Sequence, residues 1–397
     1  MEDARKRHGR RPPRIQASTR QVVEAALAVI VQASRERPAD RVLREMFRAA
    51  RGLDAEARRW ISGRVFAFYR WRRWCDAPNE KGLQHAWALQ EAYRNGSLSV
   101  SPTELRQGAI PDWVKGAMKC PPAWLEALQR VPRVWLRARR GREKAVQASL
   151  SCCNASWPAH PQCLEYLGEE DLYRTPAFQK GDFEMQDAAS QAVGWICAPE
   201  AGQNWWDACA GAGGKTLLLS DLMDNRGLIW ATDRSTRRLQ ELKRRAARAG
   251  VFNYRTSSWV RLNEIPVRSR FDGVLVDAPC TGLGTWQRNP HARWTVTPED
   301  VSQLAELQFQ LLRQAASRVK EGGRLVYSVC TLTNQETRGV TDRFTKVVTG
   351  FVPEPISSPW PGGESEGGQK GLLLWPDATG GDGMYVAVWR RTREATA

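Results

Sequence analysis

Two cysteines at the ends of predicted strands are the residues best suited to chemistry. Cys280 lies three positions after Asp277, at the end of one apolar run, and Cys330 ends another. Only the thiolate form is a competent nucleophile, and an ordinary thiol pKa of ~8.5 leaves a small fraction ionised near neutral pH. A cysteine in a core is usually inert. Two of them, each at a strand-end loop, predict nucleophilic catalysis instead.

Thiolate attack suits a reaction in which a pyrimidine ring must be activated. Carbon C5 of cytosine is a poor nucleophile, but a thiolate that adds to the neighbouring C6 makes C5 enamine-like, so that it can accept a methyl group. An acid must stabilise the charge at the ring nitrogen, and Asp277 is placed for this role. The second cysteine of the pair is a candidate for removing the C5 proton or assisting elimination.

A loop of small residues after the predicted strand 204–209 is suited to binding a nucleoside. Small residues let the backbone approach a ligand closely, and the following helix offers free N–H groups to an anion. Asp233 ends the next predicted strand, where a carboxylate can accept both ribose hydroxyls. S-adenosylmethionine carries a ribose and a carboxylate and therefore fits. The predicted cofactor-binding residues are Cys209, Ala210, Gly211, Ala212, Gly213, Gly214, Lys215, Asp233 and Asp277.

Two other nucleotide-binding loops agree less well with this sequence. A phosphate-binding loop, G-x-x-x-x-G-K-T, would need glycine where Cys209 stands, and a nicotinamide-type G-x-G-x-x-G would need a third glycine that is missing. A nucleoside triphosphatase that binds ATP but not S-adenosylmethionine is therefore a rival interpretation, and a glycine-rich turn without a ligand is another.

Strands and helices that alternate from residue 204 onwards position these loops. The predicted strands are 204–209, 228–232, 273–276 and 324–329, and the predicted helices are 215–223, 236–249, 299–319 and 335–348. Such alternation predicts a parallel, doubly wound sheet, which binds ligands at the carboxyl ends of its strands. The loops after Cys209, Thr232, Val276 and Val329 should therefore lie close together.

The first half of the chain has a different pattern. Residues 17–95 carry apolar residues at helical spacing, with Ser18 as a possible N-cap. Residues 102–132 are broken by prolines and carry Trp113 and Trp124, which predicts a packed connector. Residues 133–180 mix short strand-like runs with a helical stretch, which predicts a small α+β module.

Composition favours a polyanionic partner and a reducing compartment. The net charge is +16, and neutralising phosphates with such an excess releases counterions. Nine cysteines without a disulfide framework favour the cytoplasm. A metal site at Cys152, Cys153, Cys163 and His160 is disfavoured because no C-x-x-C pair is present.

No apolar run reaches the ~18 residues of a membrane span. The basic segment before residue 20 lacks the apolar centre of a secretory signal, and its first 16 residues are either a solvated tail or an arm that contacts RNA.

Several blocks, in this order, resemble the RsmB/Sun/NSUN family of RNA 5-methylcytosine methyltransferases. Those blocks are the lead-in 181–191, the loop 209–215, Asp233, the D-A-P-C-T-G run 277–282, the segment 288–294, the Val329-Cys330 pair, Pro376 and the closing block 382–385. The resemblance covers residues 130–391. More weakly, the N-terminal helices resemble the NusB-like RNA-binding domain of the RsmB subgroup.

This resemblance implies an α/β fold with a Rossmann-like class I methyltransferase sheet. The implied domains are a disordered tail at 1–16, NusB-like helices with the connector at 17–128, an RRM- or ferredoxin-like module at 129–180, and the methyltransferase domain at 181–391. Cys330 would be the nucleophile and Cys280 would assist product release. In DNA cytosine methyltransferases the attacking cysteine is the one that follows proline, which would make Cys280 the nucleophile here. The order of the blocks, however, is that of the RNA enzymes.

The sequence departs from the family at four places. In the small module, Leu136-Arg137-Ala138-Arg139 stands where the family usually ends in asparagine. Ala212 stands where proline is usual, and Val329 stands where threonine is usual. The family's aspartate that contacts the adenosine is missing between Arg255 and Trp259, so Ser258 or Trp259 would have to replace it, the latter by stacking.

RNA is the implied partner, ribosomal RNA before transfer RNA, and a monomer is assumed. Two basic clusters are candidate phosphate contacts, although the second could equally be a solvated helix face. They consist of Arg133, Arg137, Arg139, Arg140, Arg142 and Lys144, and of Lys243, Arg244, Arg245 and Arg248. Trp286, Arg288 and Arg293 are expected to flank an unstacked cytosine. A non-catalytic RNA-binding assembly factor is the rival function.

Overall fold

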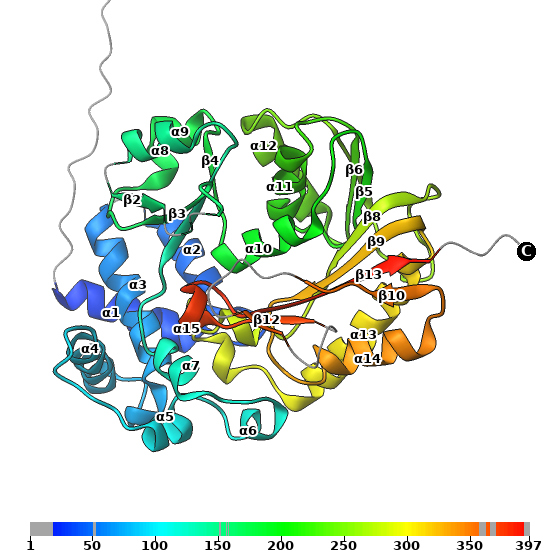
Figure 1. The fold of residues 1–397 in the computed structure, drawn as a ribbon. Coiled ribbons are helices and arrows are strands. Elements are labelled where there is room, and N and C mark those ends of the chain that lie inside the picture. The colour runs from blue at the N-terminus through cyan, green and yellow to red at the C-terminus, as the bar shows by residue number, and fades with distance from the viewer. Residues whose placement is uncertain are drawn as a thin grey trace, which may run out of the picture.

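The computed structural model describes residues 19–50, 53–150, 152–155, 157, 159–356, 363–365 and 371–392. Ser18 and the basic tail lie outside these residues. Figure 1 shows three parts, which are a group of helices near the N-terminus, a small sheet and a large sheet. Within the described residues, no helix is both long and apolar enough to cross a lipid bilayer.

Four helices form the first part, as the apolar spacing predicts. They are α1 (Thr19–Gln32), α2 (Ala39–Ala49), α3 (Ala55–Arg70) and α4 (Glu80–Arg94). Their facing sides bury Val22, Val29, Ile61, Val65 and Leu83 in one core. The last two helices begin at side-chain caps, Asp54 and Asn79, which accept hydrogen bonds from backbone N–H groups of the first turn.

The connector consists of short helices that follow η1 (Arg72–Trp74). They are α5 (Pro102–Gly108), α6 (Val114–Ala117) and α7 (Pro122–Ala127). As expected, its tryptophans pack against the C-terminal half of the chain. Trp113 meets Trp286 edge-on and Trp124 meets Trp375, with ring centroids 6.3 and 6.5 Å apart.

The small sheet has the strand order β2-β3-β1-β4, and all its pairs are antiparallel. Its elements are β1 (Val134–Ala138), α8 (Glu143–Ser149), β2 (Cys153–Ala155), β3 (Cys163–Tyr166), η2 (Leu172–Arg174), α9 (Pro176–Gln179) and β4 (Phe183–Met185). Strand β4 follows the predicted boundary at residue 180. The lead-in to the large sheet therefore also completes the small one.

The large sheet has the order β11-β12-β13-β9-β8-β5-β6-β7, and β10 pairs with β13. Its first half consists of α10 (Ala188–Cys197), β5 (Asn204–Asp207), α11 (Gly214–Leu222), β6 (Leu228–Asp233), α12 (Thr236–Arg248), β7 (Tyr254–Ser258) and β8 (Phe271–Asp277). Its second half consists of η3 (Leu283–Thr285), η4 (Ala292–Trp294), α13 (Pro298–Ala316), β9 (Val319–Val329), α14 (Arg338–Val347), β10 (Phe351–Pro353), β11 (Gly363–Ser365), β12 (Leu372–Leu374), α15 (Pro376–Thr379) and β13 (Met384–Arg391).

Strands β6, β5, β8 and β9 run parallel, as predicted, and the unpredicted β7 continues this order, but β13 is antiparallel to β9, so the sheet is mixed. Alternate strand residues face opposite layers of helices, which Figure 1 shows on the two sides of the sheet. Trp205 and Leu275 pack in one core with residues of α10 and α11. Trp206 and Val276 pack with α13. Burial on both faces explains why these strands read as continuous apolar runs.

Candidate active site

The loops after β5, β6, β8 and β9 meet at the edge of the large sheet that is formed by the carboxyl ends of these parallel strands. There the Sγ atoms of Cys280 and Cys330 lie 3.3 Å apart. Both residues are half-buried, so they lie at the boundary between the core and the surface. Two cysteines from loops 50 residues apart are therefore brought into contact, as the sequence predicts.

The surroundings of the two sulfurs differ. The hydrogen bond with Cys330, then burial, then the negative charges of Cys330 and Glu336 raise the pKa of the Cys280 thiol well above its ordinary range. Cys330 instead lies close enough to Lys215 and Arg288 to interact electrostatically with both cations. Two cations thus lie beside Cys330, whereas the negative charge of Glu336 lies beside Cys280.

Asp277 lies between the predicted cofactor loop and the end of β9. Its Oδ2 accepts a hydrogen bond of 2.7 Å from Nζ of Lys215, and its Oδ1 accepts one of 2.7 Å from the hydroxyl of Ser328. Burial opposes the charged form of Lys215, but the Asp277 carboxylate outweighs it, and the lysine pKa is raised. The ammonium group thus stays charged and fixes the orientation of this carboxylate.

The predicted cofactor loop is shaped by Gly213 and fastened by Asp233. Gly213 has φ +86° and packs against α12, where a Cβ would lie 2.6 Å from Cγ of Leu242. Asp233 accepts hydrogen bonds from the backbone N–H of Gly211 at 2.9 Å and of Ser235 at 2.7 Å. Each carboxylate oxygen can accept a further bond. Asp233 therefore joins the loops after β5 and β6 and can still accept a bond from a ligand.

Helix α11 begins directly after this loop with no side-chain cap, so its first N–H groups can receive an anion. Asp207, at the end of β5, provides a complementary feature. Its Oδ2 accepts from the hydroxyl of Thr216 at 2.6 Å, whereas its Oδ1 is buried without a hydrogen-bond partner among the described residues. Burial raises the pKa of Asp207 to about 7. The arrangement fits a ligand with a carboxylate and an ammonium group, such as the methionine end of S-adenosylmethionine.

Sequence reasoning missed Asp207 and Glu336. The signal for Asp207 is a carboxylate at the end of an apolar strand, beside the small-residue loop. Glu336 gives no local signal, because its partners come from the loops after β8 and β9 and from α13.

Stacking by Trp259 is not supported by the structure. Its ring packs against Trp206 with centroids 5.3 Å apart, it is only 6% exposed, and its Nε1 donates to the carbonyl of Arg261. The ring belongs to the core of the sheet. Of the two predicted substitutes for the missing aspartate, only Ser258 is exposed.

The prediction that Trp286 and Arg293 flank the base is wrong, because both side chains are fully buried. Arg293 donates to the carbonyls of Ala109 at 2.9 Å and Leu128 at 3.0 Å, and burial lowers its pKa to about 9. It fastens the connector to the large sheet. Arg288 is exposed and donates to the carboxylate of Asp382 at 2.8–2.9 Å, and its contact with the base stays a prediction.

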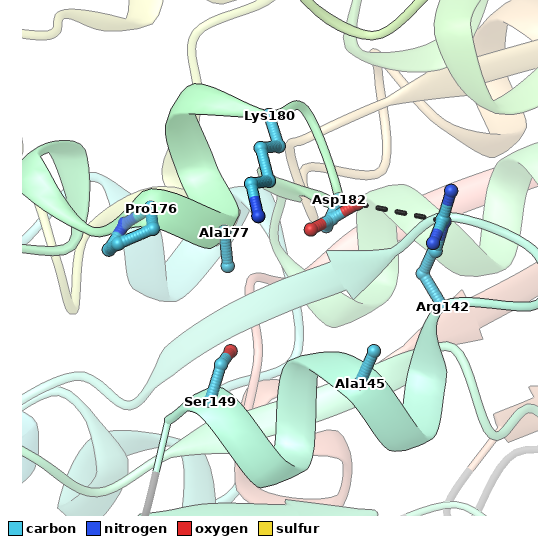
Figure 2. Close-up of a pocket in the computed structure, with 7 residues that line it drawn as sticks. All are labelled: Arg142, Ala145, Ser149, Pro176, Ala177, Lys180 and Asp182. Carbon is cyan, nitrogen blue, oxygen red and sulfur yellow. Dashed lines mark ion pairs between the residues drawn. The ribbon is translucent and has the colours of Figure 1, made fainter.

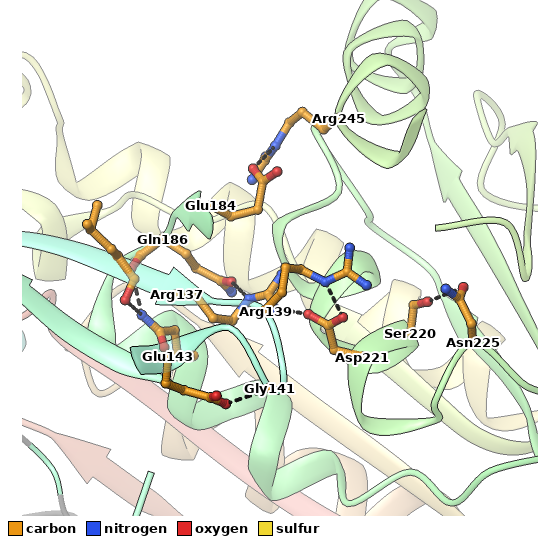
Figure 3. Close-up of polar contacts among 12 residues, drawn as sticks. Arg137, Arg139, Gly141, Glu143, Glu184, Gln186, Ser220, Asp221, Asn225 and Arg245 are labelled. Atoms are coloured by element: carbon orange, nitrogen blue, oxygen red, sulfur yellow. Dashed lines mark hydrogen bonds and ion pairs between the residues drawn. The ribbon is translucent and has the colours of Figure 1, made fainter. Parts of the chain in front are cut away.

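Parts of both predicted basic clusters form ion pairs between the small-sheet part and helices α11 and α12, as Figure 3 shows for Arg137, Arg139 and Arg245. Arg137 and Arg139 both bind the buried carboxylate of Asp221. Arg245 and Arg248 bind Glu184, which is 1% exposed. These four arginines are therefore structural. The cluster members that stay exposed are Arg133, Arg140, Arg142, Lys144, Lys243 and Arg244.

A pocket of about 600 Å³ lies in the small α+β part (Figure 2), and neither Cys280 nor Cys330 lines it. It opens between α8 and the segment that contains α9. Arg142 and Lys180 supply its positive charge, and Asp182 lies 3.6 Å from Arg142. Within the described residues, no three His, Cys, Asp or Glu side chains are grouped so that they could hold a metal ion, and His160 stacks on Trp195.

Comparison with known proteins gives a consistent result for the large sheet. Residues 195–390 match the model of a family described as 16S rRNA methyltransferase RsmB/F. The chain is 39% identical over 210 residues to ribosomal RNA small subunit methyltransferase B of Thermus thermophilus, a match that covers 52% of this chain and 50% of that protein. It is 34% identical over 244 residues to the probable methyltransferase B of Synechocystis, covering 60% and 55%. The chain thus spans about half the length of these curated relatives.

A solved structure shares this architecture. The methyltransferase homolog protein from Pyrococcus horikoshii aligns with a TM-score of 0.60 and 26% sequence identity, over 68% of this chain and 90% of that one. The large sheet and the helices around it are therefore a recurring methyltransferase fold.

Proposed function

Because residues 195–390 of this chain belong to the RsmB/F methyltransferase family, we propose that the protein methylates C5 of a cytosine in RNA, with S-adenosylmethionine as the methyl donor. The proposed substrate is small-subunit ribosomal RNA, since the matched relatives are named for it. The observation that carries the chemistry is the 3.3 Å contact between Cys280 and Cys330 at the edge where the cofactor loop ends.

Cys330 is the proposed nucleophile. Its thiolate adds to C6 of the cytosine and raises the electron density at C5. Lys215 and Arg288 are the cations that lie near this sulfur. Asp277, held by Lys215, is the proposed contact for the ring nitrogen, where charge develops. The target base must leave any stack to reach these groups.

Cys280 is the proposed base for product release, and its environment changes as the reaction proceeds. Two causes of its raised pKa, including the largest, come from Cys330 itself, namely their hydrogen bond and the charge of its sulfur. Once Cys330 is bonded to the base, these two causes no longer act and only burial and Glu336 still raise the pKa of Cys280, so its proton is lost to solvent more easily. The Cys280 thiolate then removes the C5 proton, and the bond between Cys330 and C6 breaks.

S-adenosylmethionine supplies an electrophilic methyl group when it is bound. The N-terminus of α11 would hold its carboxylate, Oδ1 of Asp207 its ammonium group, and Asp233 its ribose. The helical N-terminal part, proposed to be NusB-like, and the small sheet, proposed to be RRM-like, would hold the RNA. Their exposed cations, including those of the pocket in Figure 2, would contact phosphates.

Bisulfite sequencing of total RNA, with and without the gene, tests the proposal. We expect one or a few cytosines of small-subunit ribosomal RNA to lose methylation. Loss of methylation in transfer RNA alone would identify transfer RNA as the substrate. Unchanged methylation in every RNA would reject the proposed activity. In the same cells Cys280→Ala should accumulate a covalent protein–RNA adduct. Cys152→Ala, at an exposed cysteine of the small-sheet part, serves as the control and should not.

A further inference from the structure

Glu336 is a fully buried carboxylate, between β9 and α14, that the proposed mechanism does not use. Its Oε1 accepts hydrogen bonds from the backbone N–H of Thr281 at 2.9 Å and from Nε2 of Gln308 at 3.0 Å. Its Oε2 accepts from the hydroxyls of Thr331 at 3.1 Å, Thr333 at 2.9 Å and Thr281. A buried charge is tolerated only when it is so satisfied. These donors are therefore committed to this carboxylate.

Three of those donor groups belong to residues directly after the reactive cysteines. Thr281 follows Cys280 and contributes its backbone N–H and its hydroxyl. Thr331 follows Cys330 and contributes its hydroxyl, which lies 3.0 Å from that of Thr281. Gln308 also donates to the carbonyl of Pro279 at 2.9 Å, so Cys280 is held on both sides. One carboxylate thus fastens both cysteine loops.

We propose that Glu336 is a positioning residue that sets the spacing of Cys280 and Cys330, so that both sulfurs act on the same cytosine. This inference rests on the proposed function only for the identity of the base. Removing the carboxylate would leave the Thr281 N–H and three hydroxyls without their acceptor in a buried site, and the two loops would separate to satisfy them. The negative charge of Glu336 also adds to the causes that raise the pKa of Cys280.

A purely structural carboxylate would affect stability but not the two sulfurs, so a matched control is needed. Glu184 provides it, because it is 1% exposed, is held by Arg245 and Arg248, and lies in β4 of the small sheet rather than at Cys280 and Cys330. Glu336→Gln and Glu184→Gln make the same change of side chain. Thr281→Val with Thr331→Val removes hydroxyl donors without changing any charge.

The experiment measures sulfur spacing directly in the free protein. Diamide oxidises two neighbouring thiols to a disulfide, taking up two electrons and two protons to become the hydrazine. Peptide mass spectrometry then follows the Cys280–Cys330 linkage over time. We expect the Cys280–Cys330 disulfide to form ~10-fold more slowly in Glu336→Gln than in the parent protein. A tenfold factor corresponds to the free energy of a shift of one pKa unit. The threonine double variant should also be slower, and Glu184→Gln should match the parent.

A second readout separates positioning from stability. Alkylation of Cys280 by iodoacetamide should begin at lower pH in Glu336→Gln, because removing a nearby negative charge lowers the pKa of a thiol. On RNA, this variant should lose kcat with little change in KM. Linkage and alkylation at parental rates in Glu336→Gln would overturn the proposal. If that variant fails to fold, parental linkage in the threonine double variant would overturn it. A parent protein that methylates no RNA would reject the proposed function and leave the linkage result valid.

Discussion

The edge of the large sheet and the junction between the two sheets both gather charged residues, but they use them differently. At the junction, Asp221 and Glu184 each face two arginines. At the edge, Oδ1 of Asp207 has no partner among the described residues, and α11 begins without a cap. Paired charges hold the chain together, whereas the unpaired polar groups at the edge remain for a ligand. Variants on the two sides of this division should therefore separate catalysis and binding from stability.

Cys330→Ala should abolish methylation and leave the fold intact. Without the thiolate, C5 of cytosine is not activated, and a loss of ~10³-fold or more is expected for a nucleophile of this kind. Transfer of a radiolabelled methyl group to RNA measures the activity, and thermal unfolding measures the stability. Residual activity within tenfold of the parent protein would contradict the assignment.

Asp221→Ala should do the opposite, with a large loss of stability and no direct effect on the chemistry. It leaves Arg137 and Arg139 without their carboxylate, and breaking a buried pair in this way costs about 3–5 kcal/mol. Urea denaturation measures the free energy of unfolding. The exposed pair of Arg261 and Glu264 offers a control, since Glu264→Ala should change stability by less than about 1 kcal/mol.

Asp207→Asn should weaken S-adenosylmethionine binding by ~10- to 100-fold, the range expected when a charged hydrogen bond is lost. Isothermal titration calorimetry measures this, with Asp224→Asn, an exposed carboxylate elsewhere, as the control. Unchanged affinity would show that the free oxygen of Asp207 does not face the cofactor.

The same variant has a predicted pH signature in the free protein. Burial raises the pKa of Asp207 from 3.8 to about 7, so the folded state binds more protons than the unfolded state between these values. Its contribution to stability is therefore present at low pH and is lost as pH rises towards 7. Asp207→Asn should become more stable relative to the parent protein as pH increases through this window. A pH-independent difference in urea denaturation would reject the raised pKa.

Lys180→Ala, at the pocket of Figure 2, should have the smallest effect. A single phosphate contact changes affinity modestly and lowers the slope of log affinity against log salt by about 1. Fluorescence anisotropy with small-subunit ribosomal RNA fragments at several salt concentrations measures this. An unchanged slope would remove this pocket from the RNA-binding surface.

The sequence predicts those parts of the fold whose signals are local. Strands β5, β6, β8 and β9 are apolar runs, and the cysteine loops follow two of them. Strand β7 was missed because it is a polar edge strand, Tyr-Arg-Thr-Ser-Ser, without such a run.

Contacts between distant segments could not be predicted in the same way. Asp221 lies 84 residues after Arg137, and the carbonyls that bind Arg293 come from the connector. Nothing in a local pattern separates an arginine that binds phosphate from one that binds a buried carboxylate. Which members of the basic clusters pair with a buried carboxylate and which stay exposed therefore follows only from the folded structure, as does the role of Glu336.

Mapping the RNA-linked peptide tests the central claim most directly. The protein is incubated with S-adenosylmethionine and small-subunit ribosomal RNA that contains 5-azacytidine, and the covalent complex is digested and analysed by mass spectrometry. The nucleotide should be attached to the peptide that contains Cys330. Attachment to the Cys280 peptide, or no attachment to either cysteine, would contradict the account.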